Sequence, residues 1–121
     1  MSKILVVEDN ELNRRLFVDL LTARGHTMWE ATDGSQAIEL IQKHEPDLVL
    51  MDIQLPTISG LDVTQRIRGM TGIHQPKIIA ISAFVLKQDA EKALQAGCDD
   101  YISKPISIQS FYGAVDKNLK T

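Results

Sequence analysis

The sequence contains a single cysteine, no long apolar run and no excess of basic residues, and each of these absences excludes a class of protein. One thiol, Cys98, cannot form an internal disulfide, which fits a reducing cytoplasm. The apolar run nearest the N-terminus, 4–7, is far shorter than a signal-peptide core or a membrane span. A formal net charge of -3 provides no basic field for nucleic-acid phosphates. We therefore expect a soluble, cytoplasmic protein that binds neither nucleic acid nor membranes.

The sequence also lacks internal repeats, low-complexity tracts and interdomain linkers. Its 121 residues suffice for one hydrophobic core but not for a second functional module, so we predict a single domain, 1–121, without an output domain. The three histidines, His26, His44 and His74, do not have the spacing of metal ligands. Acidic neighbours would raise the pKa of the Cys98 thiol, so we expect it to be unreactive.

Short apolar segments alternate along the chain with amphipathic ones, which predicts an α/β fold. Strands are expected at 4–7, within 26–32, at 48–51, 77–81 and 101–103. Helices are expected at about 11–24, from 35 to just before Pro46, at 60–68, about 88–96 and 108–119. Parallel strands need crossover connections, so this alternation predicts one doubly wound, five-stranded parallel sheet with five helices. The weaker segment within 26–32 suits an edge strand.

Side-chain features refine the expected helices. Asn10, Ser59 and Ser107 are placed to cap helices, and Gly25 and Gly97 to end them. The expected inward residues of the first helix are Leu12, Leu16, Phe17, Leu20 and Leu21. In the third helix, Val63 and Ile67 are expected to face inward, and Arg66 and Arg68 to face solvent.

Polar residues follow four of the predicted strands at the point where each strand ends. Glu8 and Asp9 follow the first strand, and Asp52 follows the third. Ser82 follows the fourth strand and Lys104 follows the fifth. Because the carboxyl ends of parallel strands share one edge of the sheet, where ligands bind, we expect these five residues to lie together.

Three carboxylates at one edge would repel each other, since two like charges about 4 Å apart cost roughly 4 kcal/mol at an effective dielectric near 20. A hard divalent cation would offset this repulsion. Mg2+ suits a site with few protein oxygens, because it keeps several waters and accepts phosphate oxygens. We therefore predict a Mg2+ site formed by Glu8, Asp9, Asp52 and the main-chain carbonyl of Gln54.

The same edge has the groups that a phosphoryl transfer needs. Asp52 could attack phosphorus and become an acyl phosphate. Lys104 could neutralise one phosphoryl oxygen as a point charge, and the Ser82 hydroxyl could donate a hydrogen bond to another. We predict Asp52 as the nucleophile, with Lys104 and Ser82 as the residues that assist it.

Four motifs at these strand ends resemble the receiver domain of bacterial two-component response regulators. They are Ile4-Leu-Val-Val-Glu8-Asp9-Asn10, Leu50-Met-Asp52-Ile-Gln-Leu-Pro56, Ile81-Ser82-Ala83 and Tyr101-Ile-Ser-Lys104-Pro105. The likeness covers residues 3 to about 119 and implies a flavodoxin-like fold with strand order 2-1-3-4-5. Within the family, Val7-Glu-Asp-Asn-Glu-Leu-Asn13 and Tyr101-Ile-Ser-Lys-Pro-Ile-Ser107 are especially similar to single-domain members that regulate the cell cycle.

The resemblance also implies roles for individual residues. It implies that Asp52 is the phosphoacceptor, that Glu8 and Asp9 are metal ligands and that Lys104 contacts the phosphoryl group. Glu8 stands where many receivers have aspartate. The resemblance further implies that Ser82 and Tyr101 form a switch pair, and that the peptide bond before Pro105 is cis.

The function implied is signalling, not catalysis on a substrate. A histidine kinase or a histidine phosphotransfer protein would phosphorylate the protein, whose own chemistry would be limited to self-phosphorylation and autodephosphorylation at Asp52. A monomer is expected, with output through binding of a signalling protein at the face formed by the fourth helix, fifth strand and fifth helix. Alternative roles within the family are a phosphorelay intermediate and a flagellar-motor binder.

Two other classes with a similar fold fit the sequence less well. Phosphoaspartyl hydrolases have a second aspartate two residues after the nucleophile, where this chain has Gln54. A flavin carrier needs a phosphate-binding loop after the first strand, where Glu8 and Asp9 would repel the phosphate. The resemblance to receivers also implies that Gln54 and Phe84 flank the path of water to the acyl phosphate. Because Phe84 is apolar and would exclude water, we predict slow autodephosphorylation.

Overall fold

The apolar segments of the chain form a single sheet of five parallel strands in the computed structural model, which describes residues 2–83 and 87–119. The strands are β1 (Lys3–Val7), β2 (Thr27–Ala31), β3 (Leu48–Asp52), β4 (Lys77–Ser82) and β5 (Asp100–Ser103). Their order is β2-β1-β3-β4-β5, so the predicted order is confirmed and β2 is an edge strand, as its weak apolar pattern suggested.

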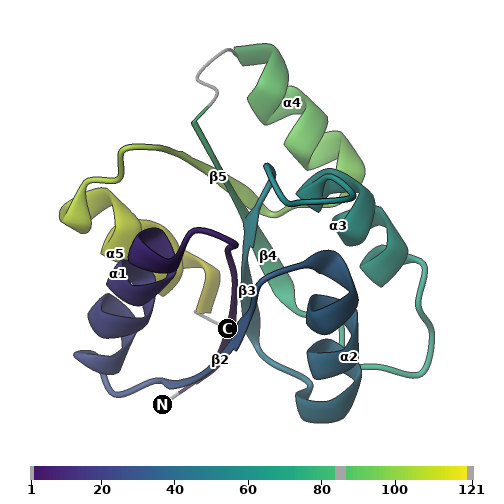
Figure 1. The fold of residues 1–121 in the computed structure, drawn as a ribbon, viewed down its shortest axis with the longest axis horizontal. Coiled ribbons are helices and arrows are strands. Elements are labelled where there is room, and N and C mark those ends of the chain that lie inside the picture. Colours follow the sequence, from purple (N-terminus) through teal and green to yellow (C-terminus); the bar gives the residue numbers. More distant parts are fainter. Residues whose placement is uncertain (1, 84–86, 120–121) are drawn as a thin grey trace.

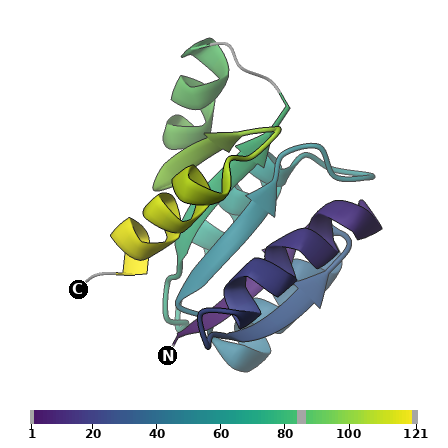
Figure 2. The same ribbon diagram turned by 90° about the vertical axis from the view of Figure 1, so that its left-hand side faces the viewer.

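Five helices cover the two faces of this sheet. They are α1 (Glu11–Thr22), α2 (Gly34–His44), α3 (Gly60–Arg68), α4 (Lys87–Ala96) and α5 (Ile108–Leu119). Figures 1 and 2 show α1 and α5 together on one face and α2, α3 and α4 on the other. Among the described residues, no helix is long and apolar enough to span a membrane.

Each face of the sheet has its own hydrophobic core, because alternate residues of a strand point to opposite sides. Toward α1 and α5, the cluster centres on the stacked rings of Phe17 and Phe111, whose centroids lie 5.5 Å apart. Toward α2, α3 and α4, it includes Ile41, Val63 and Ile67. The central strands are buried on both sides and hold the residues at their ends in fixed positions.

The predicted capping residues hold the ends of the helices. The side chains of Asn10, Ser59 and Ser107 accept hydrogen bonds from backbone N–H groups in the first turns of α1, α3 and α5. Asp33, which was not predicted as a cap, does the same for α2. Helix α2 ends at His44, before Pro46, with the next residue in a left-handed conformation. These caps satisfy donors that a helix cannot pair internally, so they fix where each helix begins.

Helix α1 differs from the prediction in its length and in its buried face. It ends at Thr22, not near Arg24. Phe17 and Leu21 are buried, whereas Leu12 is 79% exposed and Leu16 is 41% exposed. At about 100° per residue, Leu12 lies roughly 140° around the helix from Phe17, so both cannot face the sheet.

Arg68 also differs from the prediction, which placed it in solvent. Its guanidinium donates to the carbonyl oxygens of Gly97 and Pro76 at 2.8 and 2.7 Å, and to the Asp99 carboxylate at 2.8 Å. A guanidinium has five donors in a rigid fork and can therefore join several loops at once. Arg68 thus connects the end of α3 to the connections around β4 and β5.

Candidate functional site

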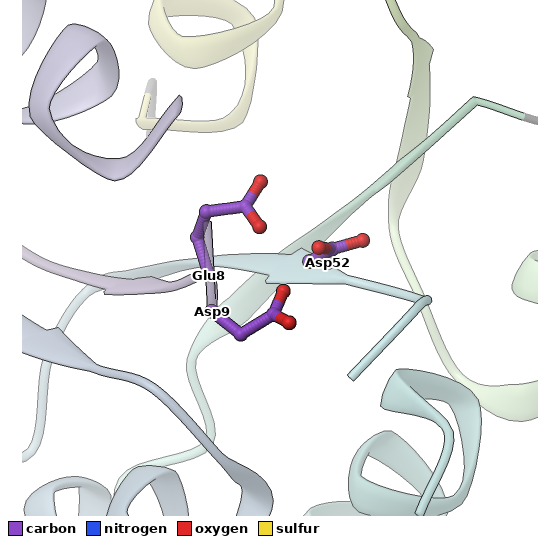
Figure 3. Close-up of side chains that lie close together, drawn as sticks. All are labelled: Glu8, Asp9 and Asp52. Atoms are coloured by element: carbon purple, nitrogen blue, oxygen red, sulfur yellow. The ribbon is translucent and has the colours of Figure 1, made fainter. Parts of the chain in front are cut away.

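Three carboxylates lie at the carboxyl edge of the sheet. Glu8 and Asp9 follow β1, and Asp52 is the last residue of β3, which pairs directly with β1. One oxygen of each carboxylate lies within 4.8 Å of the others, and Figure 3 shows the Glu8 and Asp9 side chains directed toward Asp52. Glu8 and Asp52 are buried, at 1% and 3% exposure, whereas Asp9 is exposed. The cluster is therefore open to solvent on the Asp9 side.

Lys104 contacts two of these carboxylates. Its Nζ lies 2.9 Å from Glu8 Oε1 and 3.5 Å from Asp52 Oδ2. Burial and the neighbouring Asp52 together raise the pKa of Glu8 to about 7, although the hydrogen bond from Lys104 opposes the shift. Desolvation lowers the pKa of Lys104, but Glu8 and Asp52 outweigh this effect and raise it. One ammonium group thus offsets part of the negative charge.

Backbone contacts hold the carboxylates in place. The Glu8 N–H donates to the carbonyl oxygen of Ala31 at 3.0 Å, and the Asn10 N–H donates to Glu8 Oε2 at 3.2 Å. On the other strand, the Gln54 N–H donates to Asp52 Oδ1 at 2.9 Å. This last contact leaves Asp52 Oδ2 on the side of Lys104.

Gly60 packs directly behind Asp52. A Cβ atom at this position would lie 2.1 Å from the Asp52 carbonyl oxygen, so only glycine allows this approach. Its N–H donates to the carbonyl oxygen of Ile53 at 2.9 Å. No local pattern of the sequence shows that the start of α3 contacts the end of β3.

Ser82 and Tyr101 lie on neighbouring strands near this cluster. Ser82 is fully buried at the end of β4, and its carbonyl oxygen accepts a hydrogen bond from the Lys104 N–H at 2.7 Å. Burial raises the pKa of the half-buried Tyr101 phenol, while the Ser82 side chain lowers it as a hydrogen-bond partner. The bond between Lys104 and Pro105 is cis.

Other predicted residues lie close by or outside the described part. The Gln54 side-chain oxygen accepts a hydrogen bond from the Ala83 N–H at 3.4 Å, which links the loops after β3 and β4. Phe84 lies outside the described residues. Cys98 is buried, and burial raises the pKa of its thiol. In the described chain, the group suited to a metal contains no histidine.

The donor set of this cluster fits a hard metal ion. All three groups are carboxylates, and one of them is exposed, which leaves room for water or a ligand oxygen. Oxygen donors of this kind suit Mg2+, Ca2+ or Mn2+, whereas Zn2+ sites favour nitrogen and sulfur. The acids therefore fit a hard metal ion in both chemistry and spacing.

Comparison with known proteins agrees with this geometry. Residues 4–116 match the family model of the response regulator receiver domain. The polar-differentiation response regulator DivK of Brucella anthropi is 44% identical over 118 residues, which cover 98% of this chain and 96% of the relative. DivK of Brucella ovis shows the same identity and coverage.

Solved structures show the same likeness. A two-component response regulator from Clostridium difficile has a TM-score of 0.90 at 26% identity, covering 98% of this chain and 96% of that one. The receiver domain of a Pseudomonas aeruginosa sensor histidine kinase has a TM-score of 0.89 at 32% identity, covering 99% and 98%. That structure has a magnesium ion coordinated in its active-site cleft. The fold, the acidic site and these relatives together show that this chain belongs to the response regulator receiver domain family.

Proposed function

We propose that the protein is a stand-alone response regulator that accepts a phosphoryl group on Asp52 and signals by binding another protein. The observation that supports this most directly is the position of Asp52, which is buried at a strand end with Lys104 Nζ 3.5 Å from its Oδ2. The relatives named DivK match this chain over nearly their whole length, which favours a similar role in polar differentiation and the cell cycle.

In the proposed transfer, a carboxylate oxygen of Asp52 forms a bond to phosphorus as the bond from phosphorus to a donor histidine nitrogen breaks. The Gln54 N–H fixes the orientation of the Asp52 carboxylate through Oδ1. Lys104 is close enough to neutralise a phosphoryl oxygen on the other side. Glu8, Asp9 and Asp52 would hold Mg2+, with the Gln54 carbonyl as a further ligand. When bound, the ion would supply positive charge that reduces repulsion between the acids and the phosphoryl group.

An apolar groove beside the acceptor suits the docking of a phosphodonor protein. It has a volume of about 380 Å³ and is lined by Asn13, Leu16, Phe17, Ala83, Lys104, Pro105 and Ile106. Leu12 is 79% exposed on the same helix as Leu16. Because Lys104 belongs both to this groove and to the acidic site, a protein bound here could present a phosphohistidine to Asp52. We propose a histidine kinase or a histidine phosphotransfer protein as this donor.

We further propose that phosphorylation is transmitted through Ser82 and Tyr101 to the face formed by α4, β5 and α5. Ser82 lies at the end of β4, which pairs with the acceptor strand β3. Its side chain is a hydrogen-bond partner of the Tyr101 hydroxyl. If a phosphoryl oxygen draws the Ser82 hydroxyl toward Asp52, Tyr101 loses that partner and can change position. Ser82→Ala should then still accept phosphoryl but lose phosphorylation-dependent partner binding.

The proposed function is tested by phosphorylating the purified protein with a small phosphodonor and Mg2+. The wild type should gain one phosphoryl group that is stable in acid and labile in base, as an acyl phosphate is. Asp52→Asn should gain none, because an amide is a poor nucleophile. Asp62→Asn, a change of the same kind in the exposed first turn of α3, is the matched control and should be labelled normally. Equal labelling of Asp52→Asn would refute the assignment.

A further inference from the structure

Arg14 connects three elements behind the acidic site. It lies in α1, and its side chain is only 18% exposed. Its NH1 donates to the carbonyl oxygen of Glu8 at 3.0 Å, just after β1. Its Nε donates to Glu30 Oε1 at 3.0 Å, on β2. The guanidinium therefore joins the residue that begins the acidic loop to a helix and to the edge strand.

The carbonyl that Arg14 binds belongs to the peptide between Glu8 and Asp9. The Glu8 carboxylate has partners of its own, since Asn10 N–H and Lys104 Nζ both contact it. By contrast, no hydrogen bond or ion pair of the Asp9 carboxylate is found among residues 2–83 and 87–119. The direction of the Asp9 side chain thus depends on the peptide before it, and a rotation of this peptide would move the carboxylate away from Asp52.

We propose that Arg14 is a positioning residue for the metal site. Its guanidinium holds the Glu8–Asp9 peptide in the orientation that directs the Asp9 carboxylate toward Asp52, and Glu30 orients the guanidinium. Groups that orient metal ligands without touching the metal typically change affinity by about 10- to 100-fold when they are removed. This inference rests on the proposed function only in requiring that the acids bind Mg2+.

Whether removing Arg14 weakens or tightens Mg2+ binding distinguishes a positioning role from a simple effect of its charge. A guanidinium near the site repels a metal cation, so removing its charge would tighten Mg2+ binding if charge alone mattered. Removing a positioning contact would weaken binding instead. Replacement of Arg14 by lysine keeps the charge but loses the rigid fork, so it isolates the geometric contribution.

The experiment is a calorimetric titration of the whole protein with Mg2+, for wild type, Arg14→Gln, Arg14→Lys and Arg15→Gln. Arg15 is the adjacent, exposed arginine of the same helix and serves as the matched control. Both Arg14 variants should bind Mg2+ about tenfold more weakly, and Arg15→Gln should bind as the wild type does. With a small phosphodonor, the Arg14 variants should need more Mg2+ for half-maximal labelling of Asp52, and saturating Mg2+ should recover most of the rate.

Equal or tighter Mg2+ binding by Arg14→Gln would overturn the proposal, and so would wild-type binding by Arg14→Lys. If Arg14→Gln does not fold, Arg14→Lys decides alone: weaker binding at unchanged charge supports the proposal, and wild-type binding overturns it. Failure of the wild type to bind Mg2+ would instead refute the metal site of the proposed function. The two ideas can therefore fail separately.

Discussion

Glu8 and Lys104 form the closest contact between opposite charges in the acidic site, at 2.9 Å, and Lys104 reaches Asp52 only at 3.5 Å. In the metal-free protein, Lys104 therefore pairs mainly with Glu8. A metal ion at the three acids would compete with the ammonium group for the Glu8 carboxylate. The lysine would then be released toward the position where a phosphoryl oxygen is expected.

This competition predicts the behaviour of Lys104→Met. In EDTA the variant should be less stable than the wild type by roughly 1 to 3 kcal/mol, below the range for fully buried pairs because the Lys104 side chain is 18% exposed. Mg2+ should stabilise the variant more than the wild type, because no ammonium group competes for Glu8. Urea unfolding with EDTA and with Mg2+ measures both effects.

Lys117→Met is the control for this prediction. The Lys117 side chain is 77% exposed, and its Nζ lies 4.0 Å from Asp100, so its loss should change stability little. Equal stability of Lys104→Met and the wild type in EDTA would show that the ammonium group does not compensate the acids.

At the scale of residues, the sequence predicted the functional groups at the strand ends but not the residues that hold them in position. Glu8, Asp9 and Asp52 follow apolar runs directly, and Lys104 follows the short predicted strand 101–103. A parallel sheet brings these strand ends together. Arg14 gave no comparable signal. Its role depends on a carbonyl oxygen six residues earlier and on Glu30 of another strand, and a charged helix residue is usually just solvated.

At the scale of elements, helix α1 has an exposed apolar surface that the sequence pattern predicted to be buried. Leu12 and Leu16 were expected to pack inward with Phe17, yet both are exposed. Leu16 lines the groove that reaches Lys104, and Leu12 lies one turn earlier on the same helix. Apolar periodicity alone cannot distinguish a wide buried face from a buried face adjoining an exposed apolar surface. Only the position of α1 on the sheet separates the two.

If this surface docks the phosphodonor protein, Leu12→Ser should slow phosphotransfer from the cognate kinase without slowing labelling by a small phosphodonor. The loss of an apolar contact weakens the protein complex, whereas the chemistry at Asp52 is untouched. Leu94→Ser is the matched control, because Leu94 is a 54% exposed leucine on α4. Equal transfer rates for both variants and the wild type would exclude this docking surface.

The start of α3 carries a second prediction for an element. Gly60→Ala should destabilise the protein by about 1 to 3 kcal/mol, since its Cβ would lie 2.1 Å from the Asp52 carbonyl oxygen and the backbone would have to shift. The variant should also bind Mg2+ more weakly, because Asp52 moves. Urea unfolding and a Mg2+ titration measure the two effects.

Gly113→Ala offers a control with the opposite sign. A Cβ at Gly113 meets no atom of the described chain within 4 Å, and the residue lies inside α5. Alanine should therefore stabilise the helix by about 0.5 to 1 kcal/mol. If Gly60→Ala were as stable as the wild type, the close packing of α3 on β3 would not be required.

At the scale of the whole molecule, the alternation of strands and helices was enough to predict a doubly wound parallel sheet. The order of the strands came from the family resemblance, since alternation alone allows other orders. The connection made by Arg68 between α3 and the loops around β4 and β5 could not be foreseen, because it depends on the backbone carbonyls of Gly97 and Pro76. Backbone acceptors exist at every residue and leave no trace in the sequence.

The pKa of Glu8 links the site to the stability of the whole protein. Burial and the neighbouring Asp52 raise this pKa from 4.5 to about 7, so between these values the folded state binds more protons than the unfolded state. In the metal-free protein, the contribution of Glu8 to stability therefore falls as pH rises from about 4.5 to about 7. Mg2+ binds the ionised carboxylate, so its stabilising effect should increase over the same range.

Thermal unfolding at one pH below 7 and one above it, each with EDTA and with Mg2+, tests this linkage. The rise in Tm caused by Mg2+ should be larger at the higher pH, because the metal no longer has to displace a proton from Glu8. Glu8→Gln is the control: its amide cannot titrate, so any remaining effect of Mg2+ should depend much less on pH. A Mg2+ effect in the wild type that is equal at both pH values would mean that Glu8 is already ionised in the folded protein, with Lys104 offsetting the cost of its burial.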